Sequence, residues 1–238
     1  MTKTKTMTKT KTKTKTKSVS MTEFGAGNWD PSVLVYVDLP RLFENPAWKA
    51  LDIPPFPDAD ETALELKELL SKQADTQERK RRQPLIDLEA QAAPSPMWQR
   101  VMVFSQTSHP ATFFLMQVMQ EAGKIVVMHY KDKFGRPRPS QLEPALRPTI
   151  DIPGHASYPS GHATQSFLTA KALAEVVHNH EVGFQLSRIA EDIAANREWA
   201  GVHYESDSMA GRRLATELFP LLLDVYAETF EDASQEWL

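Results

Sequence analysis

The chain has 238 residues, of which 41% are hydrophobic, so it can bury a sizeable core in one large domain or two small ones. It has no cysteine, which excludes disulfides, thiolate metal ligands and a cysteine nucleophile and leaves chemistry to histidine, lysine, arginine, serine and carboxylates. The formal net charge is −4, and no stretch of about 18 residues is apolar enough to predict a membrane span, so we expect a soluble protein.

Residues 1–20 form a tail in which threonine and lysine alternate. No apolar segment of a secretory signal follows, so the tail predicts disorder and a cytoplasmic protein. Because the tail is basic, the rest of the chain is more acidic than the net charge suggests. A short run of like charges is usually solvated, and we expect no specific binding of nucleic acid.

Residues 21–95 are predicted to form an N-terminal arm that ends in helices. Up to about residue 61 the arm is rich in proline and aromatic residues, with one short alternating stretch over 33–37, which is typical of an irregular segment wrapped over a core. Helical periodicity begins near Asp60, and a second helix is expected near residues 85–92.

Residues 96–238 are predicted to form an all-α core, a single helical bundle. A helix is expected from Pro110 to Tyr130, delivering Lys131 at its end. Prolines and glycines over 134–160 forbid long regular structure and predict a loop. Apolar periodicity predicts further helices over residues 162–177, 183–199 and 206–228.

The first cluster of candidate site residues is Lys131 and Arg138, which is followed by Pro139. A lysine at a helix end and an arginine on a proline-stiffened loop can converge on one anion, because arginine offers a planar fork of donors and lysine a compact charge. Basic loops are also common on surfaces, so this cluster alone does not define a site.

The second cluster, Ser160, Gly161 and His162, runs directly into a predicted helix. A helix N-terminus presents unpaired N–H groups and the positive end of the dipole, so Ser160 and Gly161 can donate to a bound oxyanion. The dipole is expected to lower the pKa of His162 unless an anion is bound, which suits a proton donor. The alternative is that Ser160 only caps the helix.

The third cluster is Arg197, His203 and Asp207. Arg197 is predicted to end one helix, Gly201 to make the turn, and His203 to begin the next helix. An aspartate four residues after a histidine on a helix can accept the second imidazole N–H, which fixes the tautomer and makes the histidine a better nucleophile. Such pairs also occur on surfaces and at caps. The prediction of a functional site therefore depends on the combination of the three clusters.

In this order and spacing the clusters resemble the superfamily of type-2 phosphatidic acid phosphatases and vanadium haloperoxidases. The resemblance covers roughly residues 113–218. One position departs from the phosphatase pattern, because Asn196 stands where these enzymes usually have serine and haloperoxidases often have asparagine. The resemblance implies a helical bundle of the acid phosphatase and vanadium haloperoxidase type.

The resemblance also implies a role for each site residue. The equatorial oxygens of phosphate or vanadate would be held by Lys131, Arg138, Ser160, Gly161 and Arg197. His203 would attack phosphorus, or bind the vanadium of vanadate and so be the metal ligand. His162 would protonate the leaving group or manage the protons of peroxide, and Asp207 would orient His203.

The motifs do not choose between the two activities. The short chain and the residues after Asp207 favour an acid phosphatase-like hydrolase. Such an enzyme would act on a small phosphorylated substrate through a phosphohistidine intermediate. It would be inhibited by vanadate and would need no cofactor. Asn196 and His155, five residues before Ser160, favour a haloperoxidase that uses vanadate, a halide and peroxide. His155 would then lie at the halide site or act as a supporting residue, whereas its plain alternative is a loop histidine bonded to backbone.

A non-catalytic oxyanion-binding protein is a third interpretation, which the retention of His162 and His203 beside a full set of cations argues against. The resemblance also leaves a periplasmic location open, because soluble phosphatases of the family are often exported. The sequence allows a homo-oligomer and does not identify the substrate.

Overall fold

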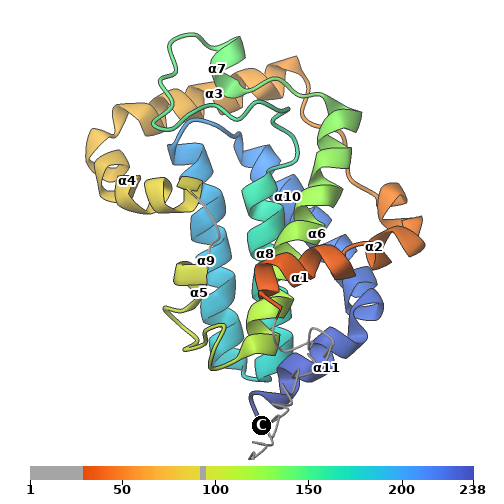
Figure 1. Ribbon diagram of the computed structural model, residues 1–238. Coiled ribbons are helices and arrows are strands. Elements are labelled where there is room, and N and C mark those ends of the chain that lie inside the picture. Colours follow the sequence, from red (N-terminus) through yellow and green to blue (C-terminus); the bar gives the residue numbers. More distant parts are fainter. Residues whose placement is uncertain (1–28, 92–94) are drawn as a thin grey trace, which may run out of the picture.

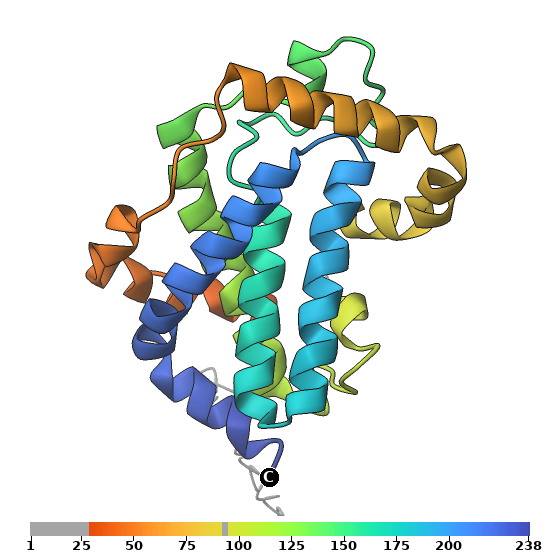
Figure 2. The same cartoon turned by 180° about the vertical axis from the view of Figure 1, so that it is seen from behind.

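The computed structural model describes residues 29–91 and 95–238, and every regular element in these ranges is a helix. Long helices form the body: α6 (Pro110–Phe134), α8 (Gly161–Val177), α9 (His180–Trp199) and α10 (Glu205–Val225). Figure 2 shows α8 between α9 and α10, and Figure 1 shows α6 in front of them. The prediction of an all-α bundle is confirmed.

Helix α8 is the centre of the bundle. Leu168, Leu173 and Val176 are fully buried, as expected of a helix that is apolar on most sides and has neighbours around it. The helix begins where Ser160 caps it, its Oγ accepting a hydrogen bond from Ala163 N at 3.4 Å. Ser160 itself is fully buried at this end of the bundle.

Gly211 on α10 lets α10 approach the start of α8 closely. A Cβ at this position would lie 2.6 Å from Ser160 O and 2.8 Å from Ala163 Cβ, distances that no larger residue could keep. Ser160 N also donates to the carbonyl of Asp207 at 2.9 Å. The start of α8, which carries the second cluster, is therefore held close to the start of α10, which carries Asp207 of the third cluster.

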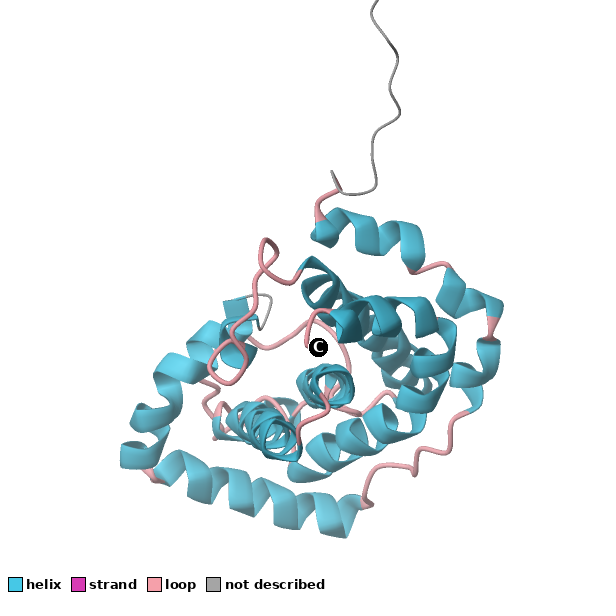
Figure 3. Ribbon diagram, turned by 90° about the horizontal axis from the view of Figure 1, so that it is seen from below, coloured by secondary structure: helices cyan, strands magenta, loops and turns pink. Residues whose placement is uncertain are grey.

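The N-terminal part wraps around this bundle. It comprises α1 (Pro31–Asp38), α2 (Arg41–Glu44), the 3-10 helix η2 (Pro46–Ala50), α3 (Ala59–Ala74) and α4 (Thr76–Gln91). Figure 1 shows α3 across one end of the bundle and α4 beside α9, and the view from below in Figure 3 shows helices along the periphery of the molecule. The predicted tail over residues 1–20 lies outside the described residues.

Some boundaries differ from those predicted. The arm is less irregular than predicted, because Asp30 caps a helix with Pro31 in its first turn and the stretch 33–37 lies in that helix. Helix α9 starts at His180 because Asn179 caps it. The short remaining helices are α5 (Ser95–Trp98), α7 (Pro139–Leu142) and α11 (Ala227–Gln235). In the part of the chain that the structure describes, no helix has the length and apolarity needed to cross a membrane.

Candidate active site

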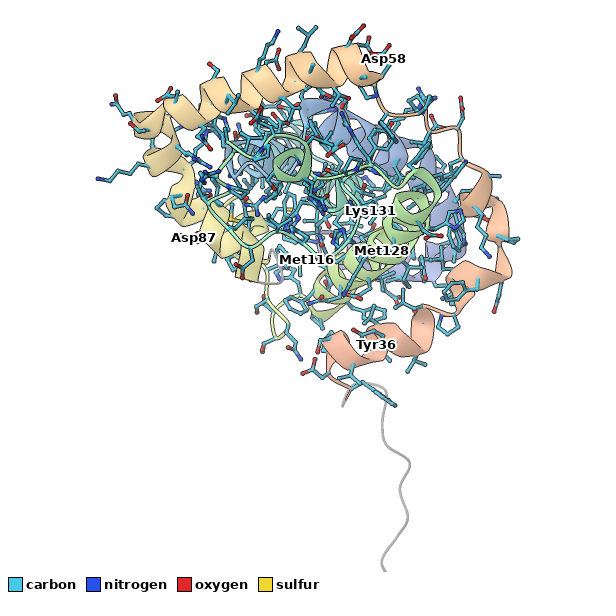
Figure 4. All side chains as sticks on the ribbon, turned by 90° about the horizontal axis from the view of Figure 1, so that it is seen from above. Tyr36, Asp58, Asp87, Met116, Met128 and Lys131 are labelled. Carbon is cyan, nitrogen blue, oxygen red and sulfur yellow. The ribbon has the colours of Figure 1, made fainter. Side chains whose placement is uncertain are left out.

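The three predicted clusters meet at the end of the bundle where α6 stops and α8 and α10 start. Seen from above in Figure 4, Lys131 lies toward the middle of the molecule, whereas Asp58 and Asp87 lie at its periphery. A pocket of about 540 Å³ opens beside Lys131. Its lining includes Glu89, Lys131, His155, Gly161, His162 and His203.

His203 is buried, and both of its ring nitrogens have protein partners. Nδ1 lies 2.8 Å from Asp207 Oδ2, and Nε2 lies 3.1 Å from Arg138 Nη1. Because a guanidinium can only donate, Nε2 is the accepting nitrogen and the ring hydrogen sits on Nδ1, directed at Asp207. The tautomer that leaves a lone pair on Nε2, as a nucleophile requires, is therefore set by two neighbours.

The predicted placement of His203 on a helix is wrong, because His203 precedes α10. Gly201 makes the predicted turn with φ of 78°, a left-handed conformation that suits glycine. The turn brings the His203 ring beside Asp207, which lies in the first turn of α10 and also accepts from Tyr204 N at 3.2 Å. A loop and a capping bond thus produce the contact that the four-residue spacing suggested.

Asp207 is held on both carboxylate oxygens. Oδ1 accepts from Arg136 Nη1 at 2.8 Å, and Oδ2 accepts from Ser157 Oγ as well as from His203. Burial alone would raise the pKa of Asp207, but the bond to His203 and the charge of Arg136 together lower it to about 2. Asp207 is therefore an ionised carboxylate that fixes the His203 ring.

Sequence reasoning missed Arg136 and Ser157 as site residues. Arg136 also bonds Glu65 Oε2 at 2.7 Å, and its guanidinium carbon lies 3.7 Å from the centroid of the Tyr204 ring. Arg136 lies between Lys131 and Arg138, and Ser157 lies between His155 and Ser160, so their proximity to the predicted site residues could have pointed to them. Their roles could not be predicted from the sequence, because these roles depend on how α3 and α10 pack against the loops.

Lys131 and Arg138 are buried and converge on the loop before α8. Lys131 Nζ donates to the carbonyls of Ala156 and Ser157, each at 2.8 Å. Arg138 donates to the carbonyl of Val202 at 2.7 Å as well as to His203. Burial lowers the pKa of Lys131 to about 7, helped by the charge of Arg138, and that of Arg138 to about 10. The structure brings these two cations together, as predicted.

Arg197 is fully buried, and its guanidinium is only partly satisfied. Nη2 donates to Glu89 Oε2 at 2.5 Å and to the carbonyl of Ile86 at 3.1 Å. Nε and Nη1 have no hydrogen-bond partner among the described residues. Buried donors without partners are rare and costly, and an oxyanion would satisfy both. The chemistry of this donor set fits phosphate and vanadate alike.

His162 lines the pocket and contacts the last turn of α4. Its Nε2 lies 3.2 Å from the carbonyl of Glu89, and because a carbonyl only accepts, Nε2 carries the hydrogen. Burial and then the charge of Arg197 lower its pKa to about 3. The lowered pKa agrees in direction with the prediction, and burial and the nearby cations are its causes.

Ser160 and Gly161 occupy the start of α8, as predicted. Ser160 caps the helix and is fully buried, so the capping alternative describes its bond to Ala163. A Cβ at Gly161 would lie 3.9 Å from Lys131 Cε, so the helix start runs close to that cation. Donation by Ser160 or the Gly161 N–H to an oxyanion stays a prediction.

His155 lies on the loop before Ser160 and lines the pocket. Its Nδ1 is 3.1 Å from both Arg138 Nη2 and the carbonyl of Ala156. One tautomer satisfies only one of these contacts, because the guanidinium donates and the carbonyl accepts. His155 therefore belongs to the surroundings of Arg138, and its role at a halide site stays a prediction.

Comparisons with known proteins agree with the helical fold. The family model described as PAP2 superfamily matches residues 111–229. A solved structure of a transmembrane PAP2-type phosphatidylglycerolphosphate phosphatase from Bacillus subtilis has a similar fold, with a TM-score of 0.53 and 16% sequence identity. The match covers 83% of this chain and 96% of that chain. A comparison with curated protein sequences gives no match.

Proposed function

This chain belongs to the PAP2 superfamily, and from that premise we propose that it is an acid phosphatase-like hydrolase of phosphate monoesters or related phosphoesters. One observation carries the proposal. His203 has Nδ1 bonded to Asp207 and the lone pair of Nε2 facing Arg138, and it lines a pocket together with the buried Lys131. This arrangement suits nucleophilic attack on a phosphoryl group.

In the first step the lone pair of His203 Nε2 attacks phosphorus, and the P–N bond forms as the P–O bond to the leaving group breaks. Asp207 stabilises the positive charge that develops on the ring. Protonated His162 gives its proton to the leaving oxygen. Its low pKa makes it a strong acid, and a nearby phosphoryl dianion would raise that pKa toward the working range.

In the second step a water molecule attacks phosphorus and gives a proton to His162. The P–N bond breaks, inorganic phosphate leaves, and His203 regains its lone pair. Lys131, Arg138 and Arg197 balance the charge on the phosphoryl oxygens in both steps. Arg138 exchanges its bond to His203 Nε2 for a bond to a phosphoryl oxygen when substrate binds.

A vanadium-dependent haloperoxidase is the second candidate, favoured by His155, which lines the same pocket and contacts Arg138. The same cations would hold vanadate at His203. Bound vanadate would supply the activation of hydrogen peroxide for halide oxidation. The two functions share the cradle and differ in what occupies it.

The test uses the purified full chain and p-nitrophenyl phosphate, with and without orthovanadate. We expect hydrolysis that orthovanadate inhibits, and no oxidation of bromide by hydrogen peroxide after loading with orthovanadate. Bromide oxidation without ester hydrolysis would establish the haloperoxidase instead. A folded chain that binds inorganic phosphate but performs neither reaction would be a non-catalytic oxyanion-binding protein.

A further inference from the structure

Glu89 is a buried carboxylate that helix α4 inserts into the candidate active site from outside residues 111–229. Its side chain is 1% exposed and lines the pocket. The last turn and a half of α4 contacts two of the predicted site residues at once, Arg197 through Ile86 and Glu89 and His162 through the Glu89 carbonyl. Neither a sequence motif nor the family match points to this helix.

The carboxylate of Glu89 bridges two consecutive residues of α9. Oε2 accepts from Arg197 Nη2 at 2.5 Å, and Oε1 accepts from Asn196 Nδ2 at 2.8 Å. The amide oxygen of Asn196 accepts from Arg82 Nη1 at 2.9 Å, and Arg82 is bonded to Glu78 at 2.7 Å. Asn196 is thereby part of a chain of bonds that runs along α4 to the surface, with Glu89 at its inner end.

Only one of the three guanidinium nitrogens of Arg197 is engaged by this network. If the Glu89 carboxylate stood in the place of the substrate anion, it would be expected to accept hydrogen bonds from Nε and Nη1 of Arg197 as well. Glu89 instead fixes Nη2 and leaves Nε and Nη1 able to donate. An arginine fixed at one nitrogen loses less side-chain entropy when the other two bind an oxyanion.

The electrostatics are consistent with a fixed pair. Burial raises the pKa of Glu89, and the charge of Arg197 opposes this shift. Burial also lowers the pKa of Arg197, and Glu89 opposes that shift in turn. Each group favours the charged form of the other in a place where either charge alone would be expensive to bury.

We propose that Glu89 is a positioning residue that holds Arg197 in the orientation needed to bind the phosphoryl oxygens. The inference rests on the proposed function, because it assigns to Glu89 an effect on the same reaction. Glu89 acts through Arg197 and not on the substrate. Its loss therefore weakens binding of the transition-state mimic orthovanadate and lowers kcat, with a smaller change in KM.

The experiment compares the full-length wild type with Glu89→Ala, Glu89→Gln and the control Glu198→Ala. Glu198 lies on α9, is buried and is paired with the partly exposed Lys72 at 2.6 Å, so its loss breaks an ion pair of α9 without removing a partner of Arg197. Affinities for inorganic phosphate and orthovanadate are measured by calorimetry, kcat and KM with p-nitrophenyl phosphate, and Tm by thermal unfolding.

We expect Glu89→Ala to weaken orthovanadate binding by about 10- to 100-fold, the effect of one charge-assisted hydrogen bond. Glu89→Gln keeps an oxygen that can accept from Nη2 and should recover most of this loss. Glu198→Ala should lower Tm and leave orthovanadate affinity unchanged. Wild-type or tighter orthovanadate binding by Glu89→Ala would overturn the proposal, as would an equal loss of affinity in Glu198→Ala.

The binding data separate this proposal from the proposed function. A wild type that binds both anions but hydrolyses no ester refutes the phosphatase, while the affinity ratio between wild type and Glu89→Ala still decides the role of Glu89. A folded wild type that binds neither anion refutes both.

Discussion

The two sides of the candidate active site differ in how completely the protein satisfies them. On the His203 side, both ring nitrogens and both oxygens of Asp207 have protein partners. On the Arg197 side, two of three guanidinium nitrogens have none among the described residues. The proposed nucleophile, His203, is thus held by protein groups alone, whereas Arg197 is held at one nitrogen and an oxyanion would bond the other two. The protein therefore preorganises His203 more completely than Arg197, as is expected if His203 Nε2 must attack phosphorus from one direction.

Both sides depend on the N-terminal helices. Glu65 on α3 bonds Arg136, which in turn bonds Asp207. Glu89 on α4 bonds Arg197. The residues matched by the family model therefore include the proposed reacting groups, and the helices before them supply carboxylates that bond to these groups or to their partners.

The largest effect is expected from Asp207→Asn, which changes the hydrogen bonding that holds His203. An amide can donate to Nδ1, so the ring hydrogen would move to Nε2 and remove the attacking lone pair. We expect kcat for ester hydrolysis to fall by about 10²- to 10⁴-fold, as when a histidine is held in the wrong tautomer. Steady-state kinetics measures the loss, and ¹⁵N NMR of the ring reports the tautomer.

The control for this variant is Asp224→Asn, an exposed aspartate on the same helix. It should retain wild-type kcat. If Asp207→Asn kept kcat within about threefold of wild type, the tautomer argument would not hold.

Arg197→Ala tests the side that an oxyanion completes. Removing one set of oxyanion donors should lower kcat/KM by about 10²- to 10³-fold. It also leaves Glu89 buried without its cation, so the free energy of unfolding in urea should fall by about 3–5 kcal/mol. Adding Glu89→Gln to this variant should restore part of the stability and none of the activity; an unchanged stability in Arg197→Ala would show that the pair is not buried as described.

A smaller effect is expected from pH through Lys131. Sulfate keeps its charge across neutral pH, so a change in its affinity reports on the protein. Because the pKa of Lys131 is about 7, the amine is charged below that pH and increasingly neutral above it. Sulfate binding measured by calorimetry should weaken as pH rises above 7, by no more than about tenfold per pH unit for one proton.

Lys131→Arg should flatten this pH dependence, because arginine stays charged throughout the range. An equally steep decline in Lys131→Arg would assign the titration to another group.

The helical fold and the gathering of the motif residues could be predicted because the relevant signals are local. Pro110 begins α6 and Ser160 caps α8, and these boundaries put Lys131 and Gly161 at neighbouring helix ends. The position of His203 before α10 could not be predicted from a four-residue spacing, since a turn and a helix both bring such residues together. The role of Glu89 was invisible because α4 is a strongly polar helix, and only its packing on α9 shows which carboxylate is buried.

The central claim is that His203 Nε2 becomes bonded to phosphorus, and trapping that bond tests it most directly. The full chain would be mixed with a phosphate monoester, quenched in alkali because phosphohistidine is labile in acid, digested and sequenced by mass spectrometry. We predict a phosphoryl group on His203, absent from the equally digested His203→Ala variant. A chain that hydrolyses the ester while carrying the label on another residue, or carrying none under single-turnover conditions, would contradict the account.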